Sequence, residues 1–118
     1  MTDVAIINNG GANIASLQFA LDRLGAASHL TTDLVELRSA RRVILPGVGA
    51  AGDAMARLRA LGLADVIPTL TQPVLGICLG MQLLFESSAE GDTACLGLIP
   101  ARVARFPDRV GLPVPHMG

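Results

Sequence analysis

The sequence contains no lysine, no tryptophan and no tyrosine. All nine basic residues are therefore arginine, which excludes a Walker-type phosphate loop and a Schiff-base mechanism, because both need a lysine. Three phenylalanines are the only aromatic residues, so the core must be built mainly from Leu, Ile, Val and Ala. Two cysteines and two histidines are too few for a Cys-rich zinc site, and we expect no metal site.

The charge balance and the length narrow the class of protein further. A net charge of −1 does not indicate a protein that binds nucleic acid or an anionic membrane through positive charge. At 118 residues, 51% hydrophobic and 16% charged, the chain is expected to fold as one small domain. It shows neither a signal-peptide pattern nor an apolar run long enough to cross a bilayer, so we expect a soluble cytoplasmic protein.

Short apolar runs alternate with segments of helical periodicity along most of the chain. The predicted strands are 4–7, 26–31, 42–45 and 73–77, with a further strand or hairpin arm within 96–106. The predicted helical segments are 14–24 after an Asn13 cap, 53–61 with Asp53 as a possible cap, 63–70 and 79–86, and residues 33–40 are a short helix or a turn. This alternation predicts a parallel sheet with helices on both faces. The loops 8–13, 46–53 and 77–80 should then open on the same sheet edge.

Cys78 lies between a predicted buried strand and a predicted helix, with Gly76 and Gly80 two residues away on either side. This is the cysteine form of a nucleophile elbow, in which the tight turn leaves no room for neighbouring side chains. The helix N-terminus favours negative charge on the sulfur, and the Leu79 N–H is placed to bind a developing oxyanion. The alternative is a small buried thiol, which is our interpretation of Cys95.

Pro46, Gly47, Val48 and Gly49 directly follow another predicted strand. Two glycines in four residues allow unusual backbone conformations and close approach to a ligand. Alone, this segment reads as an ordinary glycine-rich turn. Beside the elbow at Cys78, it is a candidate for the second half of an oxyanion hole.

These segments carry a resemblance to a known family. The run from Gly76 to Glu86, with Pro46–Gly49 upstream, resembles the class I (triad) glutamine amidotransferases. Within them it is most similar to the glutaminase subunit of imidazole glycerol phosphate synthase, of histidine biosynthesis. Matches at Gly10, Asn13, Ser16 and the terminal Pro-His-Met-Gly fit the same subunit. The resemblance implies a flavodoxin-like three-layer α/β/α sandwich with a mainly parallel sheet.

The resemblance also implies a reaction and roles for individual residues. Cys78 would attack the carboxamide of glutamine, release ammonia and leave a glutamyl thioester for water to hydrolyse. Val48 and Gly49 would line the oxyanion hole, Gln82 would bind the amino-acid end, and Glu90 would contact the ammonium group. The alternatives are a helix-surface residue for Gln82 and a solvated loop charge for Glu90. No cofactor is implied, and the ammonia would pass to a partner synthase, a β/α barrel, within a heterodimer.

Two departures from the family pattern bear on function. The run from Asn8 to Asn13 replaces the usual Asp-Tyr-Gly-x-Gly-Asn near the expected partner face. The family's downstream segment with the triad histidine and glutamate is absent, and His29 reads as a structural residue. We therefore expect residues 1–118 to be the N-terminal, incomplete portion of a glutamine amidotransferase type 1 domain, with an apolar sheet edge and face uncovered.

Two rival functions remain open from the sequence. One is a truncated, non-catalytic binding or regulatory module on the same scaffold, in which Cys78 is a redox or structural thiol. The other is a cysteine hydrolase of another class. Gln82 after the elbow and the Pro46–Gly49 loop favour glutamine as the substrate over that second rival.

Overall fold

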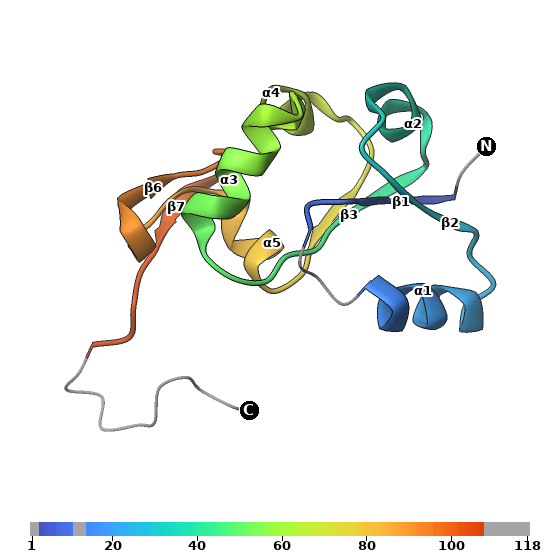
Figure 1. Cartoon of the computed structure of the whole chain (residues 1–118), viewed down its shortest axis with the longest axis horizontal. Helices are drawn as coiled ribbons and strands as arrows, with labels where there is room; N and C mark the ends of the chain where they lie inside the picture. Colours follow the sequence, from blue (N-terminus) through green and yellow to red (C-terminus); the bar gives the residue numbers. More distant parts are fainter. Residues whose placement is uncertain (1–2, 11–13, 108–118) are drawn as a thin grey trace.

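The computed structural model describes residues 3–10 and 14–107. Four strands, β1 (Val4–Ile7), β2 (Ser28–Thr31), β3 (Arg42–Leu45) and β4 (Val74–Gly76), form a sheet in the order β2-β1-β3-β4 (Figure 1). All three pairings are parallel. This order is that of flavodoxin-like sheets. The predicted α/β class with a mainly parallel sheet is confirmed.

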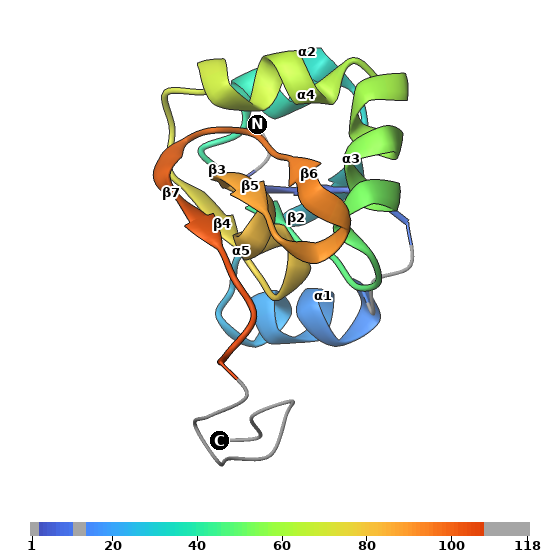
Figure 2. The same cartoon turned by 90° about the vertical axis from the view of Figure 1, so that its left-hand side faces the viewer.

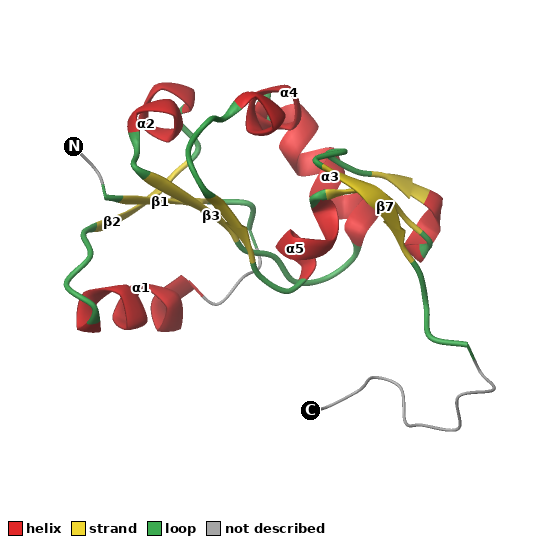
Figure 3. Ribbon diagram, turned by 180° about the vertical axis from the view of Figure 1, so that it is seen from behind, coloured by secondary structure: helices red, strands yellow, loops and turns green. Residues whose placement is uncertain are grey.

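Helices cover both faces of this sheet, as the alternation predicts. α1 (Ile14–Arg23) lies on one face, while α2 (Leu34–Ser39), α3 (Ala51–Ala60) and α4 (Leu63–Val66) lie on the other (Figure 3). Alternate strand residues supply two separate cores. Towards α1 the buried residues are Val4, Ile6, Leu21 and Ile44. The larger core on the other face includes Ala5, Ile7, Leu37, Val43, Leu45, Met55, Leu58, Leu63 and Ile67.

The helix ends agree only in part with the predictions. Gly25 follows α1 with a φ of +74°, the left-handed conformation expected of a helix-terminating glycine. The predicted Asn13 cap lies outside the described residues. Asp53 as a cap is wrong, because α3 begins at Ala51, which is fully buried in the core, and Asp53 lies within the first turn. There its carboxylate interacts favourably with the helix dipole.

The second half of the chain departs most from the predicted elements. Helix α5 (Leu79–Leu83) ends before the predicted Glu86, and the chain continues as β5 (Phe85–Ser88). A second sheet has the order β6-β5-β7, with β6 (Thr93–Ala94) antiparallel and β7 (Ile99–Val103) parallel to β5 (Figure 2). The helix ends early because Leu96 N–H donates to the Leu83 carbonyl at 2.9 Å and Gly97 N–H to the Phe85 carbonyl at 2.8 Å. These bonds replace helical ones.

Strand β4 forms one edge of the four-stranded sheet, and this edge is apolar. Leu75 is 57% exposed and Ile77 is 37% exposed. Beside them lies an open, mainly apolar hollow of about 410 Å³ on the α1 face, lined by Val4, Leu21, Arg42, Val43, Ile44, Pro73, Val74 and Leu75. The expected uncovered edge is therefore present, whereas Val4 and Ile44 on the α1 face of the sheet are buried. Within the described ranges, no helix is long and apolar enough to cross a membrane.

Candidate active site

Cys78 occupies a strained turn between β4 and α5. Its backbone angles are φ 57° and ψ −121°, and Gly80 N–H donates to the Ile77 carbonyl at 2.9 Å. This is the first central position of a type II′ turn, which normally holds glycine. A side chain at such a position costs of order 1–3 kcal/mol of strain. The turn leaves the Cys78 thiol exposed to solvent.

The two neighbouring glycines leave no space for a side chain. A Cβ atom added to Gly76 would lie 2.6 Å from the Met81 Cα. A Cβ atom at Gly80 would overlap the Leu45 carbonyl oxygen at the end of β3. The spacing that singled out Cys78 in the sequence therefore has a steric cause in the structure.

Replacing Cys78 with glycine is expected to stabilise the chain. Glycine adopts the Cys78 conformation without strain, and the exposed side chain contributes little packing, so Cys78→Gly should raise the free energy of unfolding by about 1 kcal/mol. The matched control is Ala89→Gly, since exposed Ala89 has an ordinary φ of −65° and should lose about 0.5–1 kcal/mol. Urea denaturation measures both, and equal destabilisation of the two variants would contradict strain at Cys78.

The segment after β3 packs directly against the elbow. Leu79 N–H donates to the Gly47 carbonyl at 3.2 Å, and Ile77 N–H donates to the Leu45 carbonyl at 3.0 Å. A Cβ atom on Gly47 would lie 3.1 Å from the Gly80 nitrogen, so glycine permits this approach. Gly49 follows with a φ of +93°. The Leu79 N–H, predicted as an oxyanion donor, is thus bonded to the Gly47 carbonyl in this structure.

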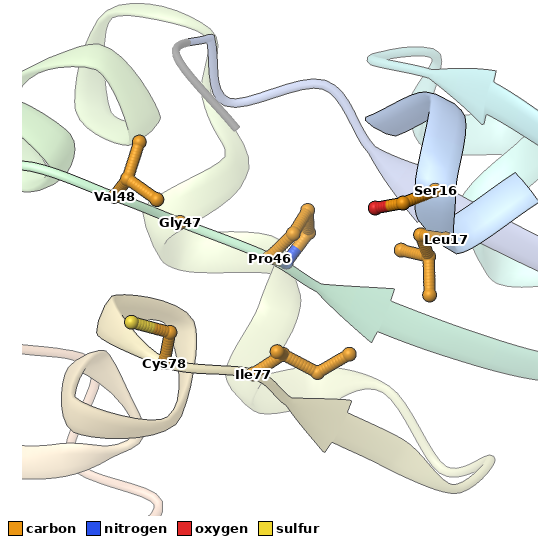
Figure 4. Close-up of a pocket in the computed structure, with 7 residues that line it drawn as sticks. All are labelled: Ser16, Leu17, Pro46, Gly47, Val48, Ile77 and Cys78. Atoms are coloured by element: carbon orange, nitrogen blue, oxygen red, sulfur yellow. The ribbon is translucent and has the colours of Figure 1, made fainter. Parts of the chain in front are cut away.

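A pocket of about 240 Å³ opens beside the Cys78 thiol (Figure 4). The Pro46–Val48 segment forms one wall, and Ser16 and Leu17 of α1 approach it from another element. Sequence reasoning had not assigned Ser16, Leu17 or Ile77 to the site. The order of the elements could have predicted this contact. In a parallel sheet the carboxyl ends of β1, β3 and β4 lie at the same edge, so the start of α1, which follows β1, comes close to the turns after β3 and β4.

Gln82 and Glu90 lie together in a second pocket, of about 530 Å³. Gln82 N–H donates to the Cys78 carbonyl at 3.3 Å, which places Gln82 one helical turn from the elbow. The other lining residues are Ser88, Ala89, Val103, Ala104 and Arg105. No local motif marks Arg105, and only the pairing of β7 with β5 brings it to this pocket.

His29 and the second cysteine, Cys95, do not line the Cys78 pocket. His29 lies on β2, at the opposite sheet edge from β4, with its Nε2 3.4 Å from a Glu36 carboxylate oxygen. Burial raises the pKa of the Cys95 thiol above its ordinary value, and the charge of Arg59 opposes this shift only in part. His116 lies outside the described residues. Among the residues that the structure describes, no histidine lines the Cys78 pocket.

Comparison with known proteins agrees with this α/β arrangement around a cysteine elbow. Residues 5–112 match the family described as glutamine amidotransferase class-I, and the chain belongs to that family. A solved structure described as that of a glutamine amidotransferase superposes with a TM-score of 0.74 at 22% sequence identity, covering 87% of this chain and 56% of that chain. This likeness concerns the fold.

Two relatives with a higher sequence identity than this structure are subunits of imidazole glycerol phosphate synthase. The chain is 56% identical over 118 residues to the imidazole glycerol phosphate synthase subunit HisH of Xanthomonas axonopodis pv. citri (strain 306). It is 55% identical over 118 residues to HisH of Xylella fastidiosa (strain Temecula1 / ATCC 700964). In both comparisons all of this chain is matched, and it spans 59% of the relative's length.

Proposed function

We propose that this chain carries the nucleophile of a glutaminase that supplies ammonia to imidazole glycerol phosphate synthase in histidine biosynthesis. The observation that carries the proposal is the strained, exposed Cys78 at the β4–α5 turn, packed against the glycine-rich segment after β3. The 56% identity to HisH supports the particular pathway. Glutamine and water would give glutamate and ammonia, and the ammonia would serve a partner that makes imidazole glycerol phosphate and aminoimidazole carboxamide ribotide.

The chemistry follows from the position of the thiol. The Cys78 sulfur attacks the carboxamide carbon of glutamine, and a base takes the thiol proton and returns it to the leaving nitrogen. The C–N bond breaks, ammonia leaves, and a glutamyl thioester remains on Cys78. Water then attacks the thioester, and the C–S bond breaks to release glutamate and restore the thiol.

The surrounding groups hold the substrate and the oxyanion in this scheme. Glu90 contacts the ammonium of glutamine, and Gln82 binds its amino-acid end. The N–H groups of Leu79 and Val48, with Gly49 beside them, stabilise the oxyanion. Because the Gly47 carbonyl accepts the Leu79 N–H at 3.2 Å, that peptide must turn before the hole opens. Glycine at positions 47 and 49 lowers the barrier to such a change.

The assembly that we propose extends beyond these residues. Residues 1–118 form the N-terminal portion of a glutamine amidotransferase type 1 domain, whose triad histidine and glutamate follow downstream. The partner synthase is a β/α barrel, joined in a heterodimer, and the chain needs no cofactor. We place the protein in the cytoplasm, where the reducing environment keeps free thiols such as Cys78 reduced.

Covalent labelling tests the proposal on the chain itself. A chloroketone analogue of L-glutamine should form one adduct per chain, at Cys78, by displacement of chloride, and intact mass with peptide mapping locates it. Cys95 should react more slowly, because partial burial limits access to its thiol and raises its pKa. Excess L-glutamine should slow the labelling, whereas D-glutamine should not. Labelling at both cysteines at equal rates, unaffected by L-glutamine, would contradict a glutamine site.

A charge substitution at Glu90 tests the binding pocket in the same assay. Glu90→Gln is expected to raise the half-protecting concentration of L-glutamine about three- to fivefold, because one charge-assisted contact in an open pocket is lost. The matched control is Glu86→Gln, since Glu86 is exposed and does not line the pocket. An equal effect of the two variants would remove Glu90 from the substrate site.

A further inference from the structure

We infer that Arg105 binds the α-carboxylate of the substrate and thereby makes the site select free glutamine over its α-amide or a peptide-linked glutamine. The inference rests on the proposed function and adds a specificity-determining residue to it. A free amino acid carries one ammonium and one carboxylate next to each other. A pocket that recognises it needs two opposite charges at a short spacing, and Glu90 and Arg105 supply them on the walls of one pocket.

The backbone holds these two residues side by side. β5 and β7 run parallel with Ser88 opposite Val103, so the chains leave the sheet at the same end. Ala89 N–H donates to the Val103 carbonyl at 2.8 Å and anchors the two exits together. Arg105 and Glu90 each lie two residues beyond this paired position. A further hydrogen bond fixes the backbone of Glu90, since its N–H donates to the Ser88 hydroxyl at 3.2 Å.

The charges in this pocket have no partner inside the described part of the chain. The ion pairs found there join His29 with Glu36, Arg41 with Asp3, and Arg102 with Asp92. Arg102, the neighbouring arginine on β7, is therefore already neutralised by Asp92 at 3.2 Å and lies outside the pocket. No carboxylate among the described residues pairs with Arg105, and a guanidinium binds an external carboxylate through two parallel hydrogen bonds.

The distance from Cys78 also suits the amino-acid end of glutamine. Three carbon–carbon bonds of about 1.5 Å separate the carboxamide carbon from the α-carbon, a span of roughly 4 Å. Gln82 lies one helical turn, about 5.4 Å, from Cys78 and lines the same pocket as Arg105. With its carboxamide at the sulfur, glutamine would therefore place its α-carbon beside Gln82, whose pocket Glu90 and Arg105 also line.

Protection of Cys78 from iodoacetamide tests the inference, with L-glutamine and L-glutaminamide as paired probes. Glutaminamide keeps the ammonium and the reacting carboxamide but lacks the α-carboxylate. In the unmodified 118-residue chain, glutamine should protect at a concentration about five- to tenfold lower than glutaminamide. Arg105→Gln should raise the half-protecting concentration of glutamine by the same factor and leave that of glutaminamide unchanged. Arg105→Lys keeps the positive charge and should therefore give a half-protecting concentration of glutamine between those of the unmodified chain and Arg105→Gln.

The matched control is Arg102→Gln, which makes the same change on the same strand outside the pocket, and it should leave both concentrations unchanged. If Arg105→Gln weakens both probes equally, its role is structural and the inference is wrong. If it changes neither, the inference is also wrong. Failure of glutamine to protect the unmodified chain would instead contradict the proposed function, so the two failures are distinguishable.

Discussion

Gly80→Ala is expected to lower the free energy of unfolding by about 3–4 kcal/mol, a large share of the stability of a small domain. The added Cβ would overlap the carbonyl oxygen of Leu45, which is backbone and cannot rotate away. Relief requires β3 and the start of α5 to separate. That separation would break the 3.0 Å bond from Ile77 N–H to Leu45 and the 3.2 Å bond from Leu79 N–H to Gly47. Urea denaturation monitored by far-UV circular dichroism measures the loss.

The same chemical change elsewhere should have the opposite sign. A Cβ at Gly52 would lie 3.6 Å from the Thr93 hydroxyl oxygen, an ordinary contact, within helix α3. Gly52→Ala is therefore expected to stabilise the chain by about 0.5–1 kcal/mol through its higher helix propensity. If Gly80→Ala cost less than about 1 kcal/mol against this control, the close packing of the elbow on β3 would be refuted.

Cys78→Ala is expected to abolish ammonia release, by a factor of at least about 10⁴, because no other group can form the thioester. The test uses a chimera in which the part of X. axonopodis HisH beyond the matched residues follows residue 118, combined with the synthase partner of that organism. In the proposed function the base lies in that part, since no histidine among the described residues lines the Cys78 pocket. The assay follows ammonia produced from glutamine.

The matched control for this variant is Cys95→Ala. Cys95 is half-buried, lies outside both pockets and contacts the Thr93 carbonyl at 3.7 Å. Its replacement should leave ammonia release within about twofold, since the side chain is small and lines neither pocket. Ammonia release that survives Cys78→Ala would remove Cys78 from the mechanism. The alanine keeps the strained turn, so the two variants should differ in activity far more than in stability.

The sequence by itself determined the order of strands and helices in the first half of the fold and the position of the turn at Cys78. A four-residue apolar run such as Val4–Ile7 is typical of a strand that is buried on both faces of a parallel sheet. The predicted bounds of this strand therefore agree with those of β1. The glycines around Cys78 were equally informative, because a Cβ at Gly76 would lie 2.6 Å from the Met81 Cα and a Cβ at Gly80 would overlap the Leu45 carbonyl oxygen. The contact at Gly76 is local, whereas the contact of Gly80 joins the turn to the end of β3, and both appear in the sequence as the spacing of glycine around Cys78.

The tertiary structure alone decided the rest. Helix α5 ends at Leu83 because the backbone N–H groups of Leu96 and Gly97 donate to the carbonyls of Leu83 and Phe85. No pattern within residues 79–86 predicts these hydrogen bonds. α3 begins at Ala51 because a small side chain fits the core there. Arg105 meets Glu90 only through the parallel register of β5 and β7, and the Leu79 N–H meets the Gly47 carbonyl only through the β3–β4 pairing. Contacts between residues far apart in the chain depend on packing, which local propensity does not encode.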